Sequence, residues 1–357
     1  MNNKGNTIRN CEITNFDEGI YIDNSDNNTV YSCTVDSNAF DGIYLTTGSD
    51  NNNILYSSIQ SNGWYLGSAG VYITTNSSSN ILFANDLTNN PEVGLKIDHS
   101  SIRNVVELNS FSNDKRAVVI DSSGQNSVIS NMMENNSFYG ILSSRATGDD
   151  YSRNLLHNNT YGIRLWSSGS NNRITENKIN NHLNYGIYIY NTDSGEVRHN
   201  LIDNTSFGIY FNHAYNWKAI ADTIENCKNY GIYMESDTDV RIDSNYICSN
   251  KEDIRDLNSS SGDNNNCQFV YNWADDGEAE GCTHSCLLCG DVIQDSNINV
   301  TDVVYLVNYL FKGGPAPLCP PSPYLDCADA NGDETVSVAD VIYLINYLFK
   351  GGPRPVC

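Results

Sequence analysis

The tetrapeptide Gly186-Ile187-Tyr188-Ile189 returns along most of the chain with little change. Close copies begin at Gly19, Gly42, Gly70, Gly94, Ala117, Gly140, Gly162, Gly208 and Gly231. Successive copies start 22 to 28 residues apart, and alternate residues within each copy are apolar, as in a strand with one buried face. A repeat of this length predicts a solenoid, in which each coil packs on its neighbours.

The charge and the cysteine content narrow the possible functions. The 357 residues carry a formal net charge of -23, which argues against a nucleic-acid partner because phosphate binding needs clustered Lys and Arg. A surplus of carboxylates suits calcium binding instead. Seven of the eleven cysteines follow residue 266, which predicts disulfides and a secreted or cell-surface location. The chain contains no run of eighteen apolar residues, so we expect no membrane span.

The beginning of the chain is unusual for a secreted protein. Met1 leads without a signal peptide into Thr7-Ile8, which already belongs to a repeat. We therefore expect further sequence upstream, which would carry the signal peptide and a polar cap for the first coil.

Between the tetrapeptide copies lies a second regular pattern, in which Asn follows an apolar residue at a fixed distance. Its first column contains Cys11, Cys33, Ser57, Asn85, Asn109, Asn131, Asn154, Asn177, Asn200, Asp222 and Asn245. A second column, four residues further on, includes Asn15, Asn89, Asn113, Asn135, Asn158, Asn181, Asn204 and Asn226. Asn tolerates the left-handed turn conformation, and its amide can bond the copy stacked above it. We interpret both columns as structural, because a ladder through every coil cannot mark one site, and Cys11 and Cys33 as stacked core thiols.

The strand repeats, the Asn columns and the coil length together resemble right-handed parallel β-helix proteins, the group that includes pectate-lyase-like and NosD-like repeats. The resemblance covers residues 1–274 and implies a mainly β fold, a solenoid with coils of about 22–24 residues. It implies little about activity, because many unrelated functions occur on such helices. Residues 275–288 are acidic, contain cysteines and are expected to form a linker.

Residues 289–357 contain a duplication with a period of 38 residues. Each copy begins with a loop rich in Asp and Asn and continues into an apolar helix, expected at Val303–Phe311 and Val341–Phe349. Both helices should end at the Lys-Gly-Gly-Pro sequence that follows, because Gly adopts the left-handed C-cap conformation and Pro cannot continue a helix. The sequence therefore predicts a small α-helical second domain.

The loops ahead of these helices carry oxygen-bearing residues at positions 1, 3, 5, 9 and 12, the pattern that Ca²⁺ requires. The second loop supplies Asp329, Asn331, Asp333, Thr335 through its carbonyl group, Ser337 and Asp340. The first loop supplies Asp291, Asp295, Asn297, Asn299 and Asp302. Its position 3 is Ile293, which offers no side-chain oxygen. We therefore expect the first loop to bind Ca²⁺ more weakly, or through a water molecule.

This tandem of calcium loops and helices resembles the dockerin module, which attaches secreted enzymes to cohesin-bearing scaffolds. The resemblance implies bound Ca²⁺ and a cohesin-like partner. Two features depart from the pattern. The positions that often read Ser-Thr in cohesin-binding dockerins are Val300-Thr301 and Val338-Ala339, and loop position 6 is Ser296 or Glu334 instead of Gly. The sequence therefore supports calcium binding better than cohesin binding.

The cysteines of the tail fit a module held by disulfides. Cys289 and Cys319 are separated by the same 30 residues as Cys327 and Cys357. This symmetry favours one disulfide within each copy, although the sequence alone leaves the connectivity open.

A metal site is an alternative role for some of these cysteines. Cys282, Cys286 and Cys289 have the spacing of an iron–sulfur motif, and His284 could complete a zinc site. The iron–sulfur motif belongs to a barrel fold that the repeats exclude, so disulfides remain the favoured interpretation.

The third residue of each tetrapeptide should face outward, by the alternation of a strand. Most copies place Tyr there, but the central coils carry Lys96, Arg164 or an apolar residue instead. The next outward position carries Asp98 and Asp121. These four charged residues are the candidate catalytic residues. Rings in the same columns provide the candidate substrate-binding residues, namely Tyr72, Trp166, Tyr188, Tyr190 and Tyr210.

An aromatic face with carboxylates and cations suits an extended polysaccharide. A lyase would need a cation to neutralise a uronate and a base to remove a proton, whereas a hydrolase would need two carboxylates, for which Asp98 and Asp121 are the candidate pair. The leading hypothesis is a secreted, calcium-binding β-helix protein that binds or degrades extracellular polysaccharide and attaches to a scaffold or surface through its tail. The alternative is a non-enzymatic surface, adhesion or structural protein, in which the Tyr column stabilises the sheet and the charges are solvated.

Overall fold

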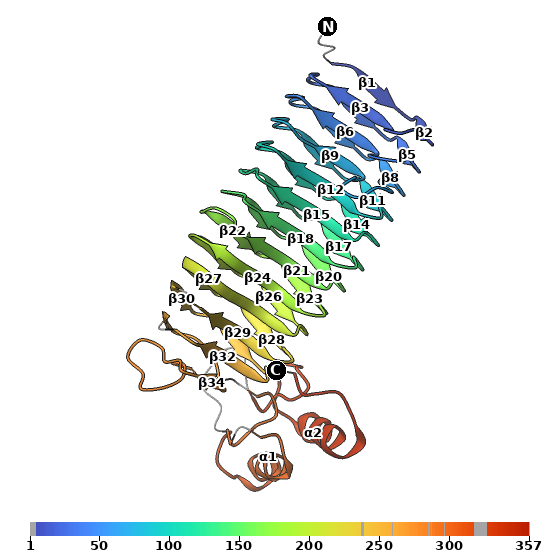
Figure 1. Ribbon diagram of the computed structural model, residues 1–357. Helices are drawn as coiled ribbons and strands as arrows, with labels where there is room; N and C mark the ends of the chain where they lie inside the picture. The colour runs from blue at the N-terminus through green and yellow to red at the C-terminus, as the bar shows by residue number, and fades with distance from the viewer. Residues whose placement is uncertain are drawn as a thin grey trace. The chain divides into compact units, whose positions relative to one another are not determined.

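The computed structural model describes residues 5–236, 239–258, 260–284, 286, 288–295, 297–317 and 327–356. The chain divides into two compact units, the first ending at His284 and the second made of the residues that follow. The first unit is a solenoid of parallel strands, and the described part of the second contains two helices (Figure 1). This architecture confirms the expected mainly β fold with a small helical module.

Three faces of parallel strands run along the solenoid, and most coils contribute one strand to each. Face A contains β1 (Thr7–Arg9), β4 (Thr29–Tyr31), β7 (Asn53–Leu55), β10 (Ile81–Phe83), β13 (Val105–Glu107), β16 (Ser127–Ile129), β19 (Asp150–Ser152), β22 (Asn172–Thr175), β25 (Gly195–Arg198), β27 (Phe207–Ile220), β30 (Asp239–Asp243) and β33 (Ser261–Asp263). Face B contains β2 (Glu12–Thr14), β5 (Thr34–Asp36), β8 (Ser58–Gln60), β11 (Asp86–Thr88), β14 (Ser110–Ser112), β17 (Met132–Glu134), β20 (Leu155–His157), β23 (Lys178–Asn180), β26 (Leu201–Asp203), β28 (Thr223–Glu225) and β31 (Tyr246–Cys248).

Face C is formed by the tetrapeptide repeats. It contains β3 (Ile20–Asp23), β6 (Ile43–Thr46), β9 (Val71–Ile73), β12 (Val93–Asp98), β15 (Arg116–Asp121), β18 (Tyr139–Ser144), β21 (Tyr161–Trp166), β24 (Tyr185–Thr192), β27, β29 (Tyr230–Glu235), β32 (Glu252–Asp256) and β34 (Val270–Tyr271). The long strand β27 belongs to two faces, because it continues from face C into face A without a break.

The tetrapeptides stack in register, so equivalent residues of successive coils are neighbours. Ile187 pairs with Ile163 on one side and with Ile209 on the other. Ile187 and Ile189 are fully buried, whereas Tyr188 is half-buried on the outer side. The alternation predicted from the sequence is confirmed. Burial of each such Ile stabilises the fold by about 1.5–3 kcal/mol relative to an exposed side chain.

The glycine that opens the tetrapeptide permits a close approach between coils. A Cβ atom on Gly186 would lie 2.7 Å from the Gly208 carbonyl oxygen and 2.7 Å from the Ile202 Cγ2 atom. Such contacts are much shorter than van der Waals separations, so a side chain at this position would push adjacent coils apart.

The two Asn columns have different structural roles. Asn177 Nδ2 donates to Asn200 Oδ1 at 3.0 Å and to the Tyr151 carbonyl oxygen at 2.8 Å, while the Asn177 backbone N–H donates to the same Asn200 oxygen at 2.9 Å. The first column therefore forms a buried ladder that satisfies backbone groups at the turns. In the second column, residues such as Asn158 and Asn181 have φ angles of 54° and 57° and supply the left-handed turn. The structural interpretation of both columns is confirmed.

The segment for which we expected a linker, 275–288, is divided between the two units at His284. Asp275 is only 1% exposed, and its carboxylate accepts hydrogen bonds from backbone and side-chain donors of the last coil. A disulfide also joins Cys267 to Cys282. The first part of the segment is therefore packed against the end of the solenoid.

The second unit contains α1 (Val300–Lys312) and α2 (Val338–Lys350), which begin three residues before the expected starts and end ahead of the predicted glycines. The N-caps are Asn299 and Ser337, and in both helices an Asp three positions later completes a capping box. The glycine after each helix is left-handed, with φ angles of 65° and 67°. A separate apolar core holds the two helices together.

Candidate functional site

The outer side of face C presents three columns of side chains aligned by the strand register. The first column contains Val93, Arg116, Tyr139, Tyr161, Tyr185, Phe207 and Tyr230. The second contains Tyr72, Lys96, Val119, Leu142, Arg164, Tyr188, Tyr210, Tyr233 and Arg255. The third contains Asp98, Asp121, Ser144, Trp166, Tyr190, Asn212 and Glu235. The sequence predicts the second and third columns but not the first, whose residues precede the glycine, where the two-residue alternation breaks.

The rings of these columns stack on one another. The centroids of Tyr188 and Tyr210 are 4.8 Å apart with an interplanar angle of 6°, and those of Tyr210 and Tyr233 are 5.0 Å apart at 9°. Trp166 stacks on Tyr190 at 4.4 Å. The rings turn their faces towards each other along the solenoid and offer mainly edges and hydroxyl groups to solvent. Trp166, Tyr188, Tyr190 and Tyr210 of the predicted substrate-binding residues are thus brought together, but few of their ring faces are free for a sugar. Tyr72 lies several strands away, where it contacts Tyr44.

Four polar side chains meet within these columns, on β9, on β12 and in the turn after β12. Lys96 Nζ donates to the Tyr72 hydroxyl oxygen at 3.0 Å, and this hydroxyl donates to Asp98 Oδ2 at 2.7 Å. Lys96 Nζ also lies 3.2 Å from Asp98 Oδ2. His99 Nδ1 lies 2.8 Å from the other carboxylate oxygen, Asp98 Oδ1. We call these four residues the Asp98 cluster.

The electrostatics of the Asp98 cluster assign a protonation state to three of its members. Burial alone would raise the pKa of Asp98, but hydrogen bonds from Thr74, His99 and Tyr72 and the charge of Lys96 lower it overall. Burial would lower the pKa of Lys96, but its bond to Tyr72 and the charge of Asp98 raise it. Burial also raises the pKa of Tyr72. At neutral pH, Asp98 is therefore an anion, Lys96 a cation and Tyr72 a protonated phenol.

His99 is the accessible member of the cluster. Its side chain is 72% exposed, whereas that of Asp98 is 3% exposed. Because Asp98 holds Nδ1, the favoured tautomer carries its proton on that nitrogen and leaves Nε2 as a proton acceptor. Among the described residues Nε2 has no partner, so it is open to a ligand.

Asp121 pairs with Asp98 in the strand register, as predicted, but its carboxylate is engaged elsewhere. Arg145 Nε and Nη2 lie 3.0 and 2.7 Å from Asp121 Oδ1, and Nη2 also contacts the second oxygen. A glycosidase needs one carboxyl group that stays protonated as the general acid. The lowered pKa of Asp98 and the bidentate contact of Asp121 do not suit that role.

Arg164 lies in the same column as Lys96 but three coils away, so the structure does not bring it to the Asp98 cluster. Its guanidinium carbon lies 4.0 Å from the centre of the Trp166 ring and 5.2 Å from that of Tyr188. Its Nη1 donates to the Tyr139 hydroxyl oxygen. Apolar residues of β15 and β18 separate the two cations.

A further carboxyl group, Asp41, lies near the Asp98 cluster and was not predicted from the sequence. It is buried in the turn before β6, and its Oδ1 accepts the Ala69 backbone N–H at 2.6 Å. Burial raises the pKa of Asp41 to about 7, and the charges of Lys96 and Asp98 also act on it. No repeat pattern identifies this residue, because its pKa depends on how tightly the adjacent coil covers it.

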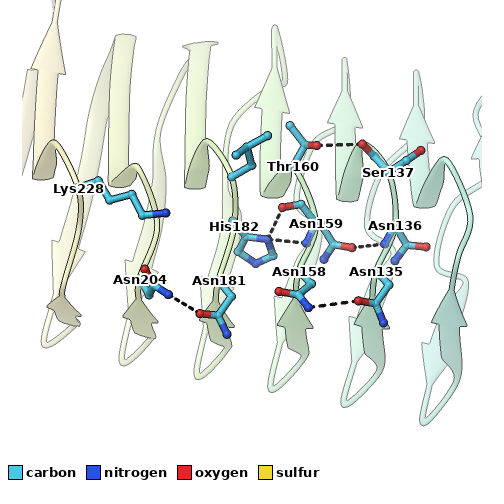
Figure 2. A pocket seen from close by; sticks show the side chains of 11 residues that line it. Asn135, Asn136, Ser137, Asn158, Asn159, Thr160, Asn181, His182, Asn204 and Lys228 are labelled. Carbon is cyan, nitrogen blue, oxygen red and sulfur yellow. Dashed lines mark hydrogen bonds between the residues drawn. The ribbon is translucent and has the colours of Figure 1, made fainter. Parts of the chain in front are cut away.

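A shallow groove of about 600 Å³ follows the turns between faces B and C. Exposed amides of the second Asn column line it, and His182 forms part of its wall (Figure 2). The lining residues are Asn135, Asn136, Ser137, Asn158, Asn159, Thr160, Asn181, His182, Leu183, Asn204 and Lys228. Burial lowers the pKa of His182 to about 4, and its Nδ1 accepts the Asn159 backbone N–H at 3.1 Å. With a neutral histidine and no carboxylate, this groove offers no acid–base pair.

In the second unit, the loop before α2 gathers three carboxyl groups. Asp329 accepts hydrogen bonds from three backbone N–H groups, including that of Asp333, and Asp340 accepts those of Asn331 and Ser337. Burial and the charges of Asp329 and Asp333 raise the pKa of Asp340. Neighbouring carboxylates in one loop fit a divalent cation. Among the described residues, however, the oxygens bond to the loop backbone and do not converge into a closed set of ligands.

The loop before α1 repeats this arrangement with one ligand fewer. Asp302 accepts the backbone N–H groups of Ile293 and Asn299 at 3.2 and 2.8 Å, and Asp291 accepts that of Asp295 at 3.1 Å. Ile293 occupies the position of Asn331, as the sequence indicates. Asn297 of the first loop and Thr335 of the second loop complete the set of predicted Ca²⁺ ligands.

The disulfides exclude the metal-site interpretation of the cysteines. Cys282, Cys286 and Cys289 are all disulfide-bonded, so none is a thiolate available to iron or zinc. Cys327 is disulfide-bonded as well. The predicted partners of Cys289 and Cys327, which are Cys319 and Cys357, lie outside the described residues.

The two thiols of the first column are not both in the core. Cys33 is a buried free thiol, as expected, but Cys11 is exposed. The difference arises because, in the part of the chain that the structure describes, the coil that contains Cys11 pairs with a neighbouring coil on one side only.

Among the described residues, no helix has the length and apolar character needed to cross a membrane. No curated protein matches the chain in sequence. A variant of the periplasmic alginate epimerase AlgG superposes with a TM-score of 0.58 over 78% of this chain and 74% of that one, at 14% identity. A second AlgG variant gives a TM-score of 0.56 over 64% of this chain and 65% of that one, at 13% identity.

The N-terminal fragment of bacteriophage Phi29 gene product 12 gives a TM-score of 0.51 over 74% of this chain and 55% of that one, at 11% identity. In the second and third of these matches, the aligned part is less than two thirds of the other chain. At such identities, the likeness shows a shared fold and no more.

Two family models match the sequence. The model described as right handed beta helix region matches residues 1–111, 109–247 and 146–297, and the dockerin type I domain model matches residues 289–349. The first covers well over half of the chain and agrees with the solenoid, and the second coincides with the paired loops and helices. The chain therefore belongs to the right-handed β-helix family and carries a dockerin type I domain at its C-terminus.

Proposed function

We propose that the protein acts on uronate-containing extracellular polysaccharide and cleaves it by β-elimination at the Asp98 cluster. The observation that carries this proposal is the set of Lys96, Tyr72, Asp98 and His99 on the outer side of face C, which hydrogen bonds and ion-pair contacts hold together. Elimination begins when a base removes the proton next to the uronate carboxylate, while a cation stabilises the charge that develops. The Asp98 cluster contains a base, a cation and a proton donor.

Each member of the cluster has one role in this reaction. His99 takes the proton on Nε2, and Asp98 stabilises the resulting imidazolium through Nδ1. Lys96 stabilises the negative charge that forms on the uronate carboxylate. The bond between the sugar carbon and the glycosidic oxygen then breaks, its electron pair stays on the oxygen, and Tyr72 donates its hydroxyl proton to that oxygen. Solvent restores both residues to their starting states.

Two further observations support the choice of substrate. The AlgG structures that share the fold are named as alginate epimerases, and alginate is a polyuronate. Epimerisation next to a carboxylate starts with the same proton removal. The cluster also disfavours hydrolysis, since the pKa of Asp98 is lowered and Asp121 is bound by Arg145.

The C-terminal unit would serve attachment. We propose that the second loop binds Ca²⁺ through Asp329, Asn331, Asp333 and Asp340, and that the first loop binds it more weakly. The match to the dockerin type I domain supports a cohesin-like partner and an extracellular or cell-surface location for the protein. The ion would supply only structural stabilisation, by neutralising the loop carboxylates.

A second candidate function is glycan binding without turnover, in which the ring edges and hydroxyl groups that the aromatic columns offer to solvent hydrogen-bond a sugar chain. Incubation with alginate, polygalacturonate and a neutral glucan separates the two candidates. Wild type should form products with the ultraviolet absorbance of an unsaturated uronate from a polyuronate, and His99→Gln and Lys96→Met should lower the rate by roughly 10²-fold or more. Binding without such products would support the second candidate, and reducing sugar without unsaturation would indicate hydrolysis.

A further inference from the structure

We infer that Arg164 forms a second anion-binding site on face C, which holds another carboxylate of the same polysaccharide. The identity of the ligand rests on the proposed function. Four cationic side chains lie in the outward columns of this face. Three of them, Lys96, Arg116 and Arg255, lie 2.8–3.2 Å from a carboxylate oxygen of the protein. Of these four cations, Arg164 alone has no carboxylate partner among the described residues.

The aromatic rings around Arg164 hold its guanidinium group in place. The guanidinium carbon lies 4.0 Å from the centre of the Trp166 ring, 5.2 Å from that of Tyr188, 5.6 Å from that of Tyr139 and 5.7 Å from that of Tyr161. Such contacts favour the cation and restrict its orientation. Nη1 donates to the Tyr139 hydroxyl oxygen, but Nε is buried without a hydrogen-bond partner. The N–H groups of Nη2, which make no hydrogen bond among the described residues, remain available to a carboxylate.

Arg255 provides an internal comparison, because it occupies the same column and also contacts aromatic rings. Its guanidinium carbon lies 5.0 Å from the centre of the Tyr230 ring and 4.8 Å from that of Tyr271. In contrast to Arg164, its Nε donates to Glu252 Oε1 at 2.8 Å. Contacts between a guanidinium group and aromatic rings thus occur at both positions. The lack of a carboxylate partner is what distinguishes Arg164 from Arg255. In a chain with a net charge of -23, a cation that aromatic rings hold in place and that lacks a carboxylate partner is suited to an external anion.

The position of Arg164 fits a chain that extends along the solenoid from the Asp98 cluster. Arg164 and Lys96 are three strands apart in one column, which corresponds to roughly 14 Å at the usual strand spacing. Val119 and Leu142 lie between them and carry no charge. A polyuronate has a carboxylate on every sugar, so one can lie at Lys96 while a later one reaches Arg164. Arg164 would therefore select acidic chains and set a minimum length for tight binding.

Calorimetric titration of the full-length protein with alginate oligosaccharides of defined length tests this site. Arg164→Gln should weaken the binding of long oligosaccharides at least about tenfold, as expected when a charged hydrogen-bond partner is lost. Arg255→Gln, the matched control, should bind like wild type. The effect of Arg164→Gln should vanish with oligosaccharides too short to span both cations, and shrink at high salt. Circular dichroism checks that both variants are folded.

The outcomes separate this inference from the proposed reaction. Three results would overturn the Arg164 site. Arg164→Gln could bind like wild type, it could lose as much affinity for a neutral glycan, or its loss of affinity could be independent of oligosaccharide length. Elimination that proceeds without any dependence of binding on Arg164 would overturn the site and leave the reaction standing. Conversely, binding that depends on Arg164 without an unsaturated product would retain the site and reject the reaction. If no oligosaccharide binds wild type, both are wrong.

Discussion

Replacement of Asp222 by Asn should remove one contribution to the pH dependence of solenoid stability. Asp222 occupies the buried Asn ladder, where its Oδ1 accepts the backbone N–H and the Nδ2 of Asn200 at 2.7 and 2.9 Å. Its Oδ2 is buried without a partner. At the equivalent position, Asn245 Nδ2 donates to the Ala219 carbonyl oxygen at 2.9 Å. An Asn at position 222 would keep the acceptor and supply the missing donor.

The size of the change in unfolding free energy follows from the pKa of the Asp222 carboxyl group. Burial raises the pKa of Asp222 to about 7, against about 3.9 in an unfolded chain. The folded state therefore keeps a proton that the unfolded state releases, and the free energy of unfolding falls as the pH rises from about 4 to about 7. Three pKa units correspond to about 4 kcal/mol in total, of which about 3 kcal/mol is lost between pH 5 and pH 8. The Asn variant cannot lose this proton.

Urea unfolding at pH 5 and pH 8 measures the free energy of unfolding of wild type and of Asp222→Asn. Far-ultraviolet circular dichroism monitors the unfolding at constant Ca²⁺. The stability advantage of Asp222→Asn over wild type should widen by about 3 kcal/mol between the two pH values. Asp203→Asn, which changes a half-buried carboxylate on the outside of a neighbouring coil, should show no such widening. If wild type and Asp222→Asn lose stability in parallel, the assignment of a buried, protonated carboxyl group to the ladder is wrong.

Three other predictions concern the solenoid and the calcium loops. Replacement of Cys267 and Cys282 by Ser should lower the free energy of unfolding of the solenoid by about 3 kcal/mol, because the bond closes a loop of 15 residues; an unchanged urea midpoint would contradict this. Asp329→Ala should weaken Ca²⁺ binding in calorimetric titration more than Asp291→Ala does, since only the second loop has a side-chain oxygen at position 3, and equal losses would count against the ranking. Gly186→Ala should destabilise the protein by about 1–3 kcal/mol, because its Cβ would meet the next coil at 2.7 Å, and a Tm equal to that of wild type would refute the close-approach argument.

Much of the fold could be predicted because its determinants are local and repeated. The spacing of the Gly-Ile-Tyr-Ile copies defines the coils, and the Lys-Gly-Gly-Pro sequences mark the helix ends. The sequence could not predict which Asn column forms the buried amide ladder and which supplies the left-handed turn, because Asn suits both roles. Packing decides which column is buried. The residues ahead of the glycine, such as Tyr185, were also missed, although an aromatic residue precedes the glycine in each copy from Tyr139 to Tyr230 and could have identified this column.

The candidate site was predicted in part for the same reason. Lys96 and Asp98 share a strand, and Tyr72 lies one coil away, so the register alone places them together. The engagement of Asp121 by Arg145 could not be foreseen, because Arg145 adopts a left-handed turn conformation with φ of 50° that the repeat does not specify. The high pKa of Asp41 likewise depends on tertiary burial.

The central claim is that the Asp98 cluster removes the proton next to a uronate carboxylate. Polyuronate labelled with deuterium at that carbon reports this step directly, because the label passes to the solvent when the base removes it. Wild type should release deuterium into water, His99→Gln should release it roughly 10²-fold or more slowly, and the control Arg145→Gln should resemble wild type. Chain cleavage with the deuterium retained, or equal release by wild type and His99→Gln, would contradict the proposed mechanism.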